Sequence, residues 1–197
     1  MASATRPTQL PERAPLTDGV VLLREPLESD VDAIAEGARD LDVAFFTRVP
    51  SPYTRTHGEE FVAQIPPWWA AATDAVWAVC DPAQPAVLLG LVGLHGIDLT
   101  GEPGGVAELG YWMSPRGRGR GLMTRAVRLA CAWGIDELAL TRIDWFAIVG
   151  NEPSRRVAES VGFEVEGILR RGESRRGERL DHWIGGLLAE DLARGEA

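Results

Sequence analysis

Cysteine and histidine are both scarce in this chain. Cys80 and Cys131 stand at no metal-ligand spacing and fall in apolar segments, so we interpret both as small buried residues and expect no disulfide framework. The three histidines, His57, His95 and His182, join no cluster of metal ligands, and we expect no metal. On a strand, a histidine satisfied by its neighbours is commoner than a catalytic one.

Long apolar runs are also missing. No segment approaches the roughly 20 apolar residues that cross a bilayer, and the start of the chain lacks the apolar stretch of a signal peptide. We therefore expect a cytoplasmic protein with no membrane partner. Residues 1–18 hold three prolines and no periodicity, which predicts a flexible arm. Residues 19–197 are enough for one domain with one core.

Positive charge is in deficit. Twenty basic residues face 29 acidic ones, a formal net charge of -9, which opposes broad binding to nucleic acid. The arginines are nevertheless clustered, and the cluster comprises Arg116, Arg118, Arg120, Arg125 and Arg128. This local basic spot favours a compact polyanion as ligand, or else it is a solvated helix face. The acidic remainder would steer a cationic amine toward the protein.

A glycine-rich loop lies next to these arginines. Residues 106–113 are bulky and strand-like, whereas apolar residues recur at helical spacing from Met123 onward. Gly117, Gly119 and Gly121 therefore come just before a helix. The free N–H groups and positive dipole of a helix start bind anions, and glycines let a phosphate approach closely.

Two common phosphate motifs do not fit this loop. A dinucleotide fingerprint needs glycine at the position of Leu122. A nucleoside-triphosphate loop needs Lys and then Ser or Thr directly after Gly121, where the chain has Leu122 and Met123.

The segment Arg118-x-x-Gly121-x-Met123 resembles the acetyl-CoA loop of the GCN5-related N-acetyltransferases (GNAT), whose last position is Gly or Ala. Met123 departs from that pattern. Arg116-x-x-Gly119-x-Gly121 obeys it in an overlapping register, although the flanking residues favour the first alignment. Downstream, Asn151-x-x-Ser154, a short helix ending in Gly162-Phe163 and a following Glu-Gly are similar to the closing motif of the branch that acetylates N-termini of ribosomal proteins. The resemblance covers about residues 19–192.

The resemblance implies acetyl-CoA as cosubstrate, and a homodimer. In this family the strand before the loop splays from its neighbour and pairs with the pantetheine arm. The residues then implied in acetyl-CoA binding are Tyr111, Trp112, Met113, Arg118, Gly119, Arg120, Gly121, Leu122, Met123, Thr124, Asn151 and Ser154.

Acetyl transfer needs an uncharged amine and a proton for the leaving thiolate. The resemblance implies Glu173 as the base that acts through water, and Glu108 or solvent is the alternative. Glu173 equally suits an ordinary acid that neutralises nearby arginines. Ser154 matches the residue that protonates the sulfur, but a serine here also suits a helix cap, as does Asn151. Tyr111 is a further candidate acid.

Periodicity predicts an α/β (α+β) domain of three layers, with a mixed sheet of about seven strands and helices on both faces. The strands are expected at 20–23, 75–80, 87–97, 106–113, 142–148, 163–169 and 181–188. Helices are expected from a cap at Ser29-Asp30 to about Leu41, and over 56–72, 123–138 and 154–161. Pro66 and Pro67 should break or kink the second helix and leave Trp68 and Trp69 near a bend. Both tryptophans are expected in the core, and the alternative is that they line the acceptor mouth.

We therefore expect an acetyl-CoA-dependent N-acetyltransferase that acts by direct transfer in a ternary complex. The acceptor implied by the resemblance is a protein N-terminal amine. A small-molecule amine is the alternative acceptor, and a noncatalytic acyl-CoA sensor is the alternative class.

Overall fold

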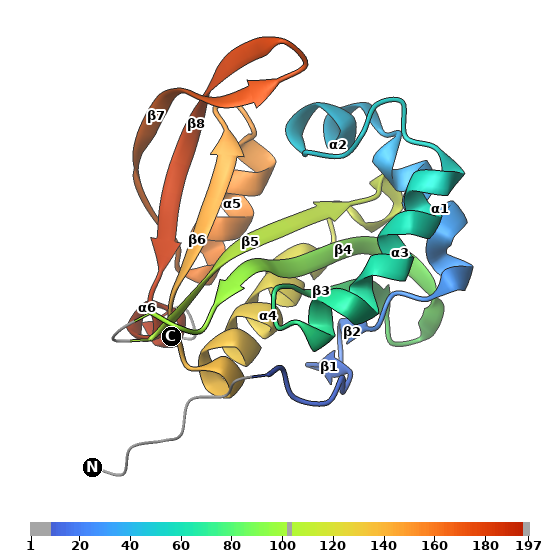
Figure 1. The fold of residues 1–197 in the computed structure, drawn as a ribbon, viewed down its shortest axis with the longest axis horizontal. Coiled ribbons are helices and arrows are strands. Elements are labelled where there is room, and N and C mark those ends of the chain that lie inside the picture. Colours follow the sequence, from blue (N-terminus) through green and yellow to red (C-terminus); the bar gives the residue numbers. More distant parts are fainter. Residues whose placement is uncertain (1–8, 102–103, 195–197) are drawn as a thin grey trace.

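An eight-stranded mixed sheet with helices on both faces forms the domain (Figure 1). The computed structural model describes residues 9–101 and 104–194. In spatial order the sheet runs β1-β2-β3-β4-β5-β6-β8-β7. The strands are β1 (Leu16–Thr17), β2 (Leu22–Arg24), β3 (Ala75–Asp81), β4 (Gln84–Asp98), β5 (Gly105–Met113), β6 (Leu140–Ile148), β7 (Glu164–Arg175) and β8 (Glu178–Leu187). The predicted layers are confirmed, and the strand beyond the expected seven is the two-residue β1.

Different helices cover the two faces of the sheet. The helices are α1 (Val31–Ala38), α2 (Leu41–Phe46), α3 (Arg55–Ala70), α4 (Leu122–Leu138), α5 (Glu152–Val161) and α6 (Ala189–Arg194). On one face, α1 packs on β4 and α3 on β3; on the other, α4 lies across β3 to β6 and α5 packs on β6 (Figure 1). Within the described part of the chain, none of these helices has the length and apolar character that crossing a bilayer requires.

The start of the described chain packs against the domain. Leu10 is buried, the Trp69 indole N–H donates to the Pro11 carbonyl at 2.9 Å, and Leu16 pairs with Leu23. Residues 10–17 thus belong to the folded body, whereas the expectation of a flexible arm extended to residue 18. Residues 1–8 of that expected arm lie outside the described residues.

The predicted break of the second helix at its two prolines did not occur. α3 runs from Arg55 to Ala70 with Pro66 and Pro67 inside it. Both prolines fall in its last two turns, and apolar contacts anchor the helix on either side of them. Ile65 is 2% exposed, and Trp69 meets Trp77 and Trp133 ring to ring. This tertiary packing outweighs the steric preference of proline.

Strands β5 and β6 are paired over only half their length. They run parallel from Gly105↔Leu140 to Leu109↔Trp145. Beyond that point β5 keeps its partner β4 up to Met113, while β6 keeps its partner β8 up to Ile148. Figure 1 shows the result, because β6, β8 and β7 fan away from β4 and β5. The separation expected from the resemblance is therefore present.

The arginine-rich segment between the last two strands is itself a hairpin. β7 extends to Arg175 and β8 begins at Glu178, and the turn residues Arg176 and Gly177 both have positive φ, as hairpin turns require. The β7–β8 register shifts between Leu169 and Glu173. Such a bulge re-aims the side chains beside it, and Glu173 faces the interior with 12% exposure.

A buried ion pair fixes the start of α1. Both terminal nitrogens of Arg24 donate to Asp30, at 2.7 and 2.8 Å, and Asp30 also accepts the Leu27 N–H at 2.7 Å. Asp30 was expected to cap the helix. Its carboxylate instead makes no cap bond to α1 and is only 2% exposed.

Asp30→Ala should lower the free energy of unfolding by about 3 kcal/mol, because it leaves the Arg24 guanidinium buried without its anion. Urea unfolding at pH 7 measures this. Asp32→Ala is the matched control, since the Asp32 side chain is 79% exposed and should change stability by less than about 1 kcal/mol. Equal effects of the two substitutions would contradict this role for the buried pair.

Candidate active site

A cavity of about 980 Å³ opens where β5 and β6 separate. It is bordered by the α2–α3 segment, the glycine loop, the start of α5 and the β7–β8 hairpin. The predicted site residues that line it are Tyr111, Trp112, Met113, Arg118, Gly119, Gly121, Leu122, Met123, Thr124, Asn151, Ser154 and Glu173. Arg120 does not line it, because its guanidinium turns away to Asp81 at 2.8 Å.

The glycine loop leaves room for an anion at the start of α4. Gly119 and Gly121 have φ of +73° and +71°, and a Cβ added to either would meet no atom within 4 Å. α4 begins at Leu122, and the side chains of Leu122 and Met123 are buried in the core. A side chain at position 123 therefore does not fill the loop, which explains how methionine stands where the family pattern has Gly or Ala. The free N–H groups of this 17-residue helix suit a diphosphate.

The expected basic spot is largely neutralised by acids from distant segments. Arg118 pairs with Asp40 and with Asp42, at 3.1 Å to the latter, and Arg125 pairs with Asp18 at 2.6 Å. An anion bound at the loop would therefore contact backbone N–H groups. It would pair with Arg118 only by displacing the Asp40 and Asp42 carboxylates from that guanidinium. The sequence could not reveal these partners, because they lie 76 to 107 residues away along the chain.

Hydrogen bonds connect Tyr111 of β5 to Ser154 at the start of α5 and, through Ser154, to Trp145 of β6. The Tyr111 hydroxyl donates to the Ser154 carbonyl at 2.8 Å, the Ser154 hydroxyl donates to the Tyr111 oxygen at 2.9 Å, and the Trp145 indole donates to Ser154 Oγ at 3.2 Å. Burial raises the pKa of Tyr111, with the Ser154 and Trp145 hydrogen bonds opposing it, so the phenol stays protonated at neutral pH. A pair of hydroxyl groups therefore lies at the cavity wall.

Of the two predicted cap residues, Asn151 and Ser154, it is Asn151 that caps α5. Its side-chain oxygen accepts the Ser154 N–H at 3.3 Å, as the N-cap of α5. Ser154 makes no cap bond, and its hydroxyl is committed to Tyr111 and Trp145 instead.

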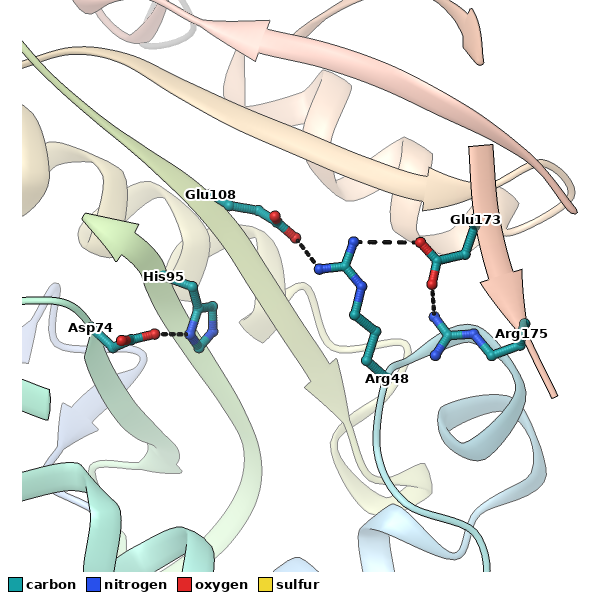
Figure 2. Close-up of polar contacts among 6 residues, drawn as sticks. All are labelled: Arg48, Asp74, His95, Glu108, Glu173 and Arg175. Atoms are coloured by element: carbon teal, nitrogen blue, oxygen red, sulfur yellow. Dashed lines mark hydrogen bonds and ion pairs between the residues drawn. The ribbon is translucent and has the colours of Figure 1, made fainter. Parts of the chain in front are cut away.

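One arginine bridges the two carboxylates that the sequence offered as bases. Arg48 Nη1 lies 3.1 Å from Glu108, and its Nη2 lies 3.4 Å from Glu173 (Figure 2). Arg175 contacts the other Glu173 oxygen at 3.0 Å. Sequence reasoning counted Arg175 among the arginines that Glu173 could neutralise, but it missed Arg48, which lies in the α2–α3 connection with no motif around it.

Two histidines also line the cavity. His95 Nδ1 lies 2.9 Å from an Asp74 oxygen (Figure 2). Burial raises the pKa of Asp74, but hydrogen bonds from His95 and Thr73 outweigh it and hold that pKa below its usual value. His182 on β8 is 6% exposed, and burial lowers its pKa, with Arg48 and Arg175 adding to this and Glu173 and Glu108 opposing it.

Trp68 and Trp69, for which the acceptor mouth was the alternative to a place in the core, do not line the cavity. Trp69 belongs to the core with Trp77 and Trp133, and the Trp68 ring packs on Phe61. α3 continues through Pro66 and Pro67, and these ring contacts hold both side chains away from the cavity.

Comparison with known proteins gives a family match over most of the chain. The sequence profile of the acetyltransferase (GNAT) domain matches residues 21–164. The Bacillus subtilis protein named "Putative ribosomal N-acetyltransferase YdaF" is 35% identical over 108 residues, which are 55% of this chain and 57% of YdaF. The matched segments thus span little more than half the length of such relatives.

Solved structures share the fold over nearly the whole chain. Mycobacterium smegmatis RimJ in complex with CoA-disulfide superposes with a TM-score of 0.79 at 22% identity, covering 91% of this chain and 88% of RimJ. The microcin C7 self immunity acetyltransferase MccE, in complex with acetyl-CoA and AMP, superposes with a TM-score of 0.76 at 20% identity, covering 87% and 93%. At these identities the likeness establishes the fold.

Gly121→Val should weaken CoA binding at least tenfold, because a branched side chain occupies the open loop and the positive φ is strained. Isothermal titration with CoA measures this. Gly177→Val is the matched control, since Gly177 also has positive φ and open surroundings but lies at the β7–β8 turn. The control should bind CoA like the wild type, and unchanged affinity in Gly121→Val would overturn the loop assignment.

His182→Gln should make the protein less sensitive to acid. The pKa of His182 is lowered in the folded state, so below about 6.5 the unfolded chain binds this proton more readily and the folded state loses stability as the pH falls. One such group changes the free energy of unfolding by at most about 1.4 kcal/mol per pH unit. Urea unfolding at pH 7.5 and 5.5 measures the loss, with His57→Gln as control. Equal losses in His182→Gln and the control would refute this.

Proposed function

The chain belongs to the GNAT acetyltransferase family, and from this premise we propose that it transfers an acetyl group from acetyl-CoA to a protein N-terminal amine. The observation that carries the proposal is the shared cavity. It joins the open glycine loop at α4, the separated edges of β5 and β6, and the side chains of Glu173 and Ser154. A diphosphate, an extended amide-bearing arm and a reacting amine each find matching groups there.

The acetyl-CoA diphosphate is proposed to lie on the backbone of residues 119–124, where the helix start supplies free N–H groups. The pantetheine arm then runs along Tyr111, Trp112 and Met113, whose β6-facing backbone is no longer paired with β6. This arrangement brings the thioester beside the separation point at Leu109 and Gly110. Backbone N–H groups near Gly110 are suited to polarise its carbonyl.

Glu173 is proposed to accept the first proton of the acceptor through a bound water. An N-terminal amine has a reference pKa of about 7.7–8.0, so much of it is protonated at neutral pH and cannot attack. Arg48 and Arg175 hold the two Glu173 oxygens. They fix the carboxylate in the cavity wall, and a water beside it is the group that contacts the amine.

Ser154 is proposed to protonate the departing thiolate. Its hydroxyl is free of capping duty because Asn151 caps α5. Tyr111, whose pKa is raised by burial, keeps its own proton and accepts a hydrogen bond from the Ser154 hydroxyl, while the Trp145 indole donates to Ser154 Oγ and holds that oxygen in place. The reaction is thus a direct transfer in a ternary complex, with nucleophile and leaving group handled by different walls of the cavity.

A protein N-terminus is favoured as acceptor by the relative named as a ribosomal N-acetyltransferase. The net charge of -9 would also attract a cationic amine. A small-molecule amine is the second candidate, since MccE shares the fold and its name is that of an immunity acetyltransferase.

A panel of peptides and small amines tests the proposal. Thiol release from acetyl-CoA should be fastest with an N-terminal peptide of a ribosomal protein and should vanish when that peptide is N-terminally blocked. Faster turnover of small amines would transfer the assignment to the second candidate. Binding of acetyl-CoA without turnover of any amine would indicate a sensor.

Glu173→Gln should lower kcat by about a hundredfold at pH 7 and leave CoA affinity within about twofold, because the glutamate acts on the amine. The deficit should shrink as the pH rises above the amine pKa, where the amine is already uncharged. Glu178→Gln, on the exposed side of the hairpin turn, is the control and should behave like the wild type. Wild-type kcat in Glu173→Gln would leave Glu108 or solvent as the base.

A further inference from the structure

Amide formation removes two protons from the amine nitrogen, and the residues discussed so far provide an acceptor for only one of them. The acceptor enters as R–NH3⁺ and leaves as an amide R–NH–acetyl, so nitrogen loses two protons. The thiolate gains one, and one proton is released to solvent. Glu173 accounts for the first proton, which leaves before attack. The second remains on nitrogen after the N–C bond has formed and must depart as the C–S bond breaks.

We propose that His95, oriented by Asp74, is the catalytic residue that accepts this second proton. The inference rests on the proposed acetyl transfer and extends it. His95 stands on β4 directly opposite Glu108 of β5, and its ring lines the same cavity. None of the recognised motifs includes His95 or Asp74.

The position of the ring is set by two facing glycines. Gly93 of β4 pairs with Gly110 of β5. A Cβ on Gly93 would come within 2.8 Å of His95 Nε2, and a Cβ on Gly110 would come within 3.0 Å of the same atom. The ring therefore lies over this pair in space that any other residue would fill. Because Gly110 directly follows the last β5 residue paired with β6, Nε2 lies at the point of separation.

The carboxylate partner decides which ring nitrogen accepts a proton. Asp74 has a pKa below its usual value and is ionised at neutral pH, so it accepts from His95 Nδ1 at 2.9 Å (Figure 2). The hydrogen is thereby held on Nδ1, and the lone pair is on Nε2. Among the described residues, no group hydrogen-bonds to His95 Nε2.

The two glutamates of this wall are already paired with arginines. Glu108, opposite His95, pairs with Arg48, and the same guanidinium reaches Glu173. Arg175 holds the second Glu173 oxygen, and His182 lies buried on β8 beyond them. A base that accepts a proton directly at the separation point is therefore best supplied by His95, whose side chain is 39% exposed and can return the proton to water.

The complete step balances as follows. The nitrogen lone pair forms the N–C bond, Nε2 of His95 takes the remaining extra proton, and the carbonyl re-forms as the C–S bond breaks. The sulfur takes the Ser154 proton, which solvent replaces. Glu173 and His95 each release one proton to solvent and Ser154 takes one back, so one net proton appears per turnover.

The test separates the two proton acceptors by their pH dependence. His95→Gln should lower kcat by about 10²–10³-fold and leave CoA affinity within about twofold. Its deficit should persist at pH 9–9.5, because the second proton is lost only after attack, whereas the Glu173→Gln deficit should shrink there. Asp74→Asn should lower kcat by about tenfold, since it removes the partner that orients the ring. His57→Gln, outside the cavity, should keep wild-type kcat.

Rescue by added imidazole distinguishes loss of a proton acceptor from a structural effect of the substitution on kcat. In His95→Ala, added imidazole should restore part of kcat in proportion to its unprotonated fraction, and thermal melting should show a folded protein. Turnover of His95→Gln within threefold of the wild type would overturn the inference, as would a deficit that disappears at high pH. If the wild type itself acetylates no amine, the proposed function fails as well. If the wild type is active and the His95 variants are too, only the role of His95 fails.

Discussion

The separation of β5 from β6 after Leu109 and Trp145 is the constraint on which the site depends. Each strand remains paired on its other side, so the sheet opens without leaving either strand unsupported. Tyr111 reaches across the opening to Ser154 at the start of α5 and holds its two sides together. An extended ligand with amide groups is the natural partner for backbone edges exposed in this way.

The alternation of side chains along β5 divides the proposed chemistry between two walls. Gly110 and Glu108 face the side of His95 and Arg48. Tyr111 faces the other side, toward Ser154. Groups proposed to take protons from the amine are thereby kept apart from the group proposed to return one to sulfur. Arg48 lies between Glu108 and Glu173, and together with Arg175 it balances their two negative charges, so two carboxylates can share one cavity.

The sequence predicted the features that rest on local signals. Strand and helix periodicity located β3 to β6 and α4, and the glycine spacing located the loop, because both depend on near neighbours. α2 was missed because six residues carry too little periodicity. The contacts of Arg48, Arg118 and Arg125 were missed because their partners are distant in the chain. The predicted break of α3 was wrong because packing of Ile65 and Trp69 outweighed the prolines. The sequence favoured a non-catalytic His95, because its partner Asp74 stands 21 residues earlier, just before β3, and residue spacing alone does not reveal that the two meet.

Backbone amide hydrogen exchange with and without CoA tests the central claim most directly. If the thioester carrier lies between the separated strands, saturating CoA should slow exchange at Gly110–Met113 and at residues 121–124. Amides at the β7–β8 turn, residues 176–178, should be unaffected. Exchange at residues 110–113 that is the same with and without saturating CoA would contradict the account.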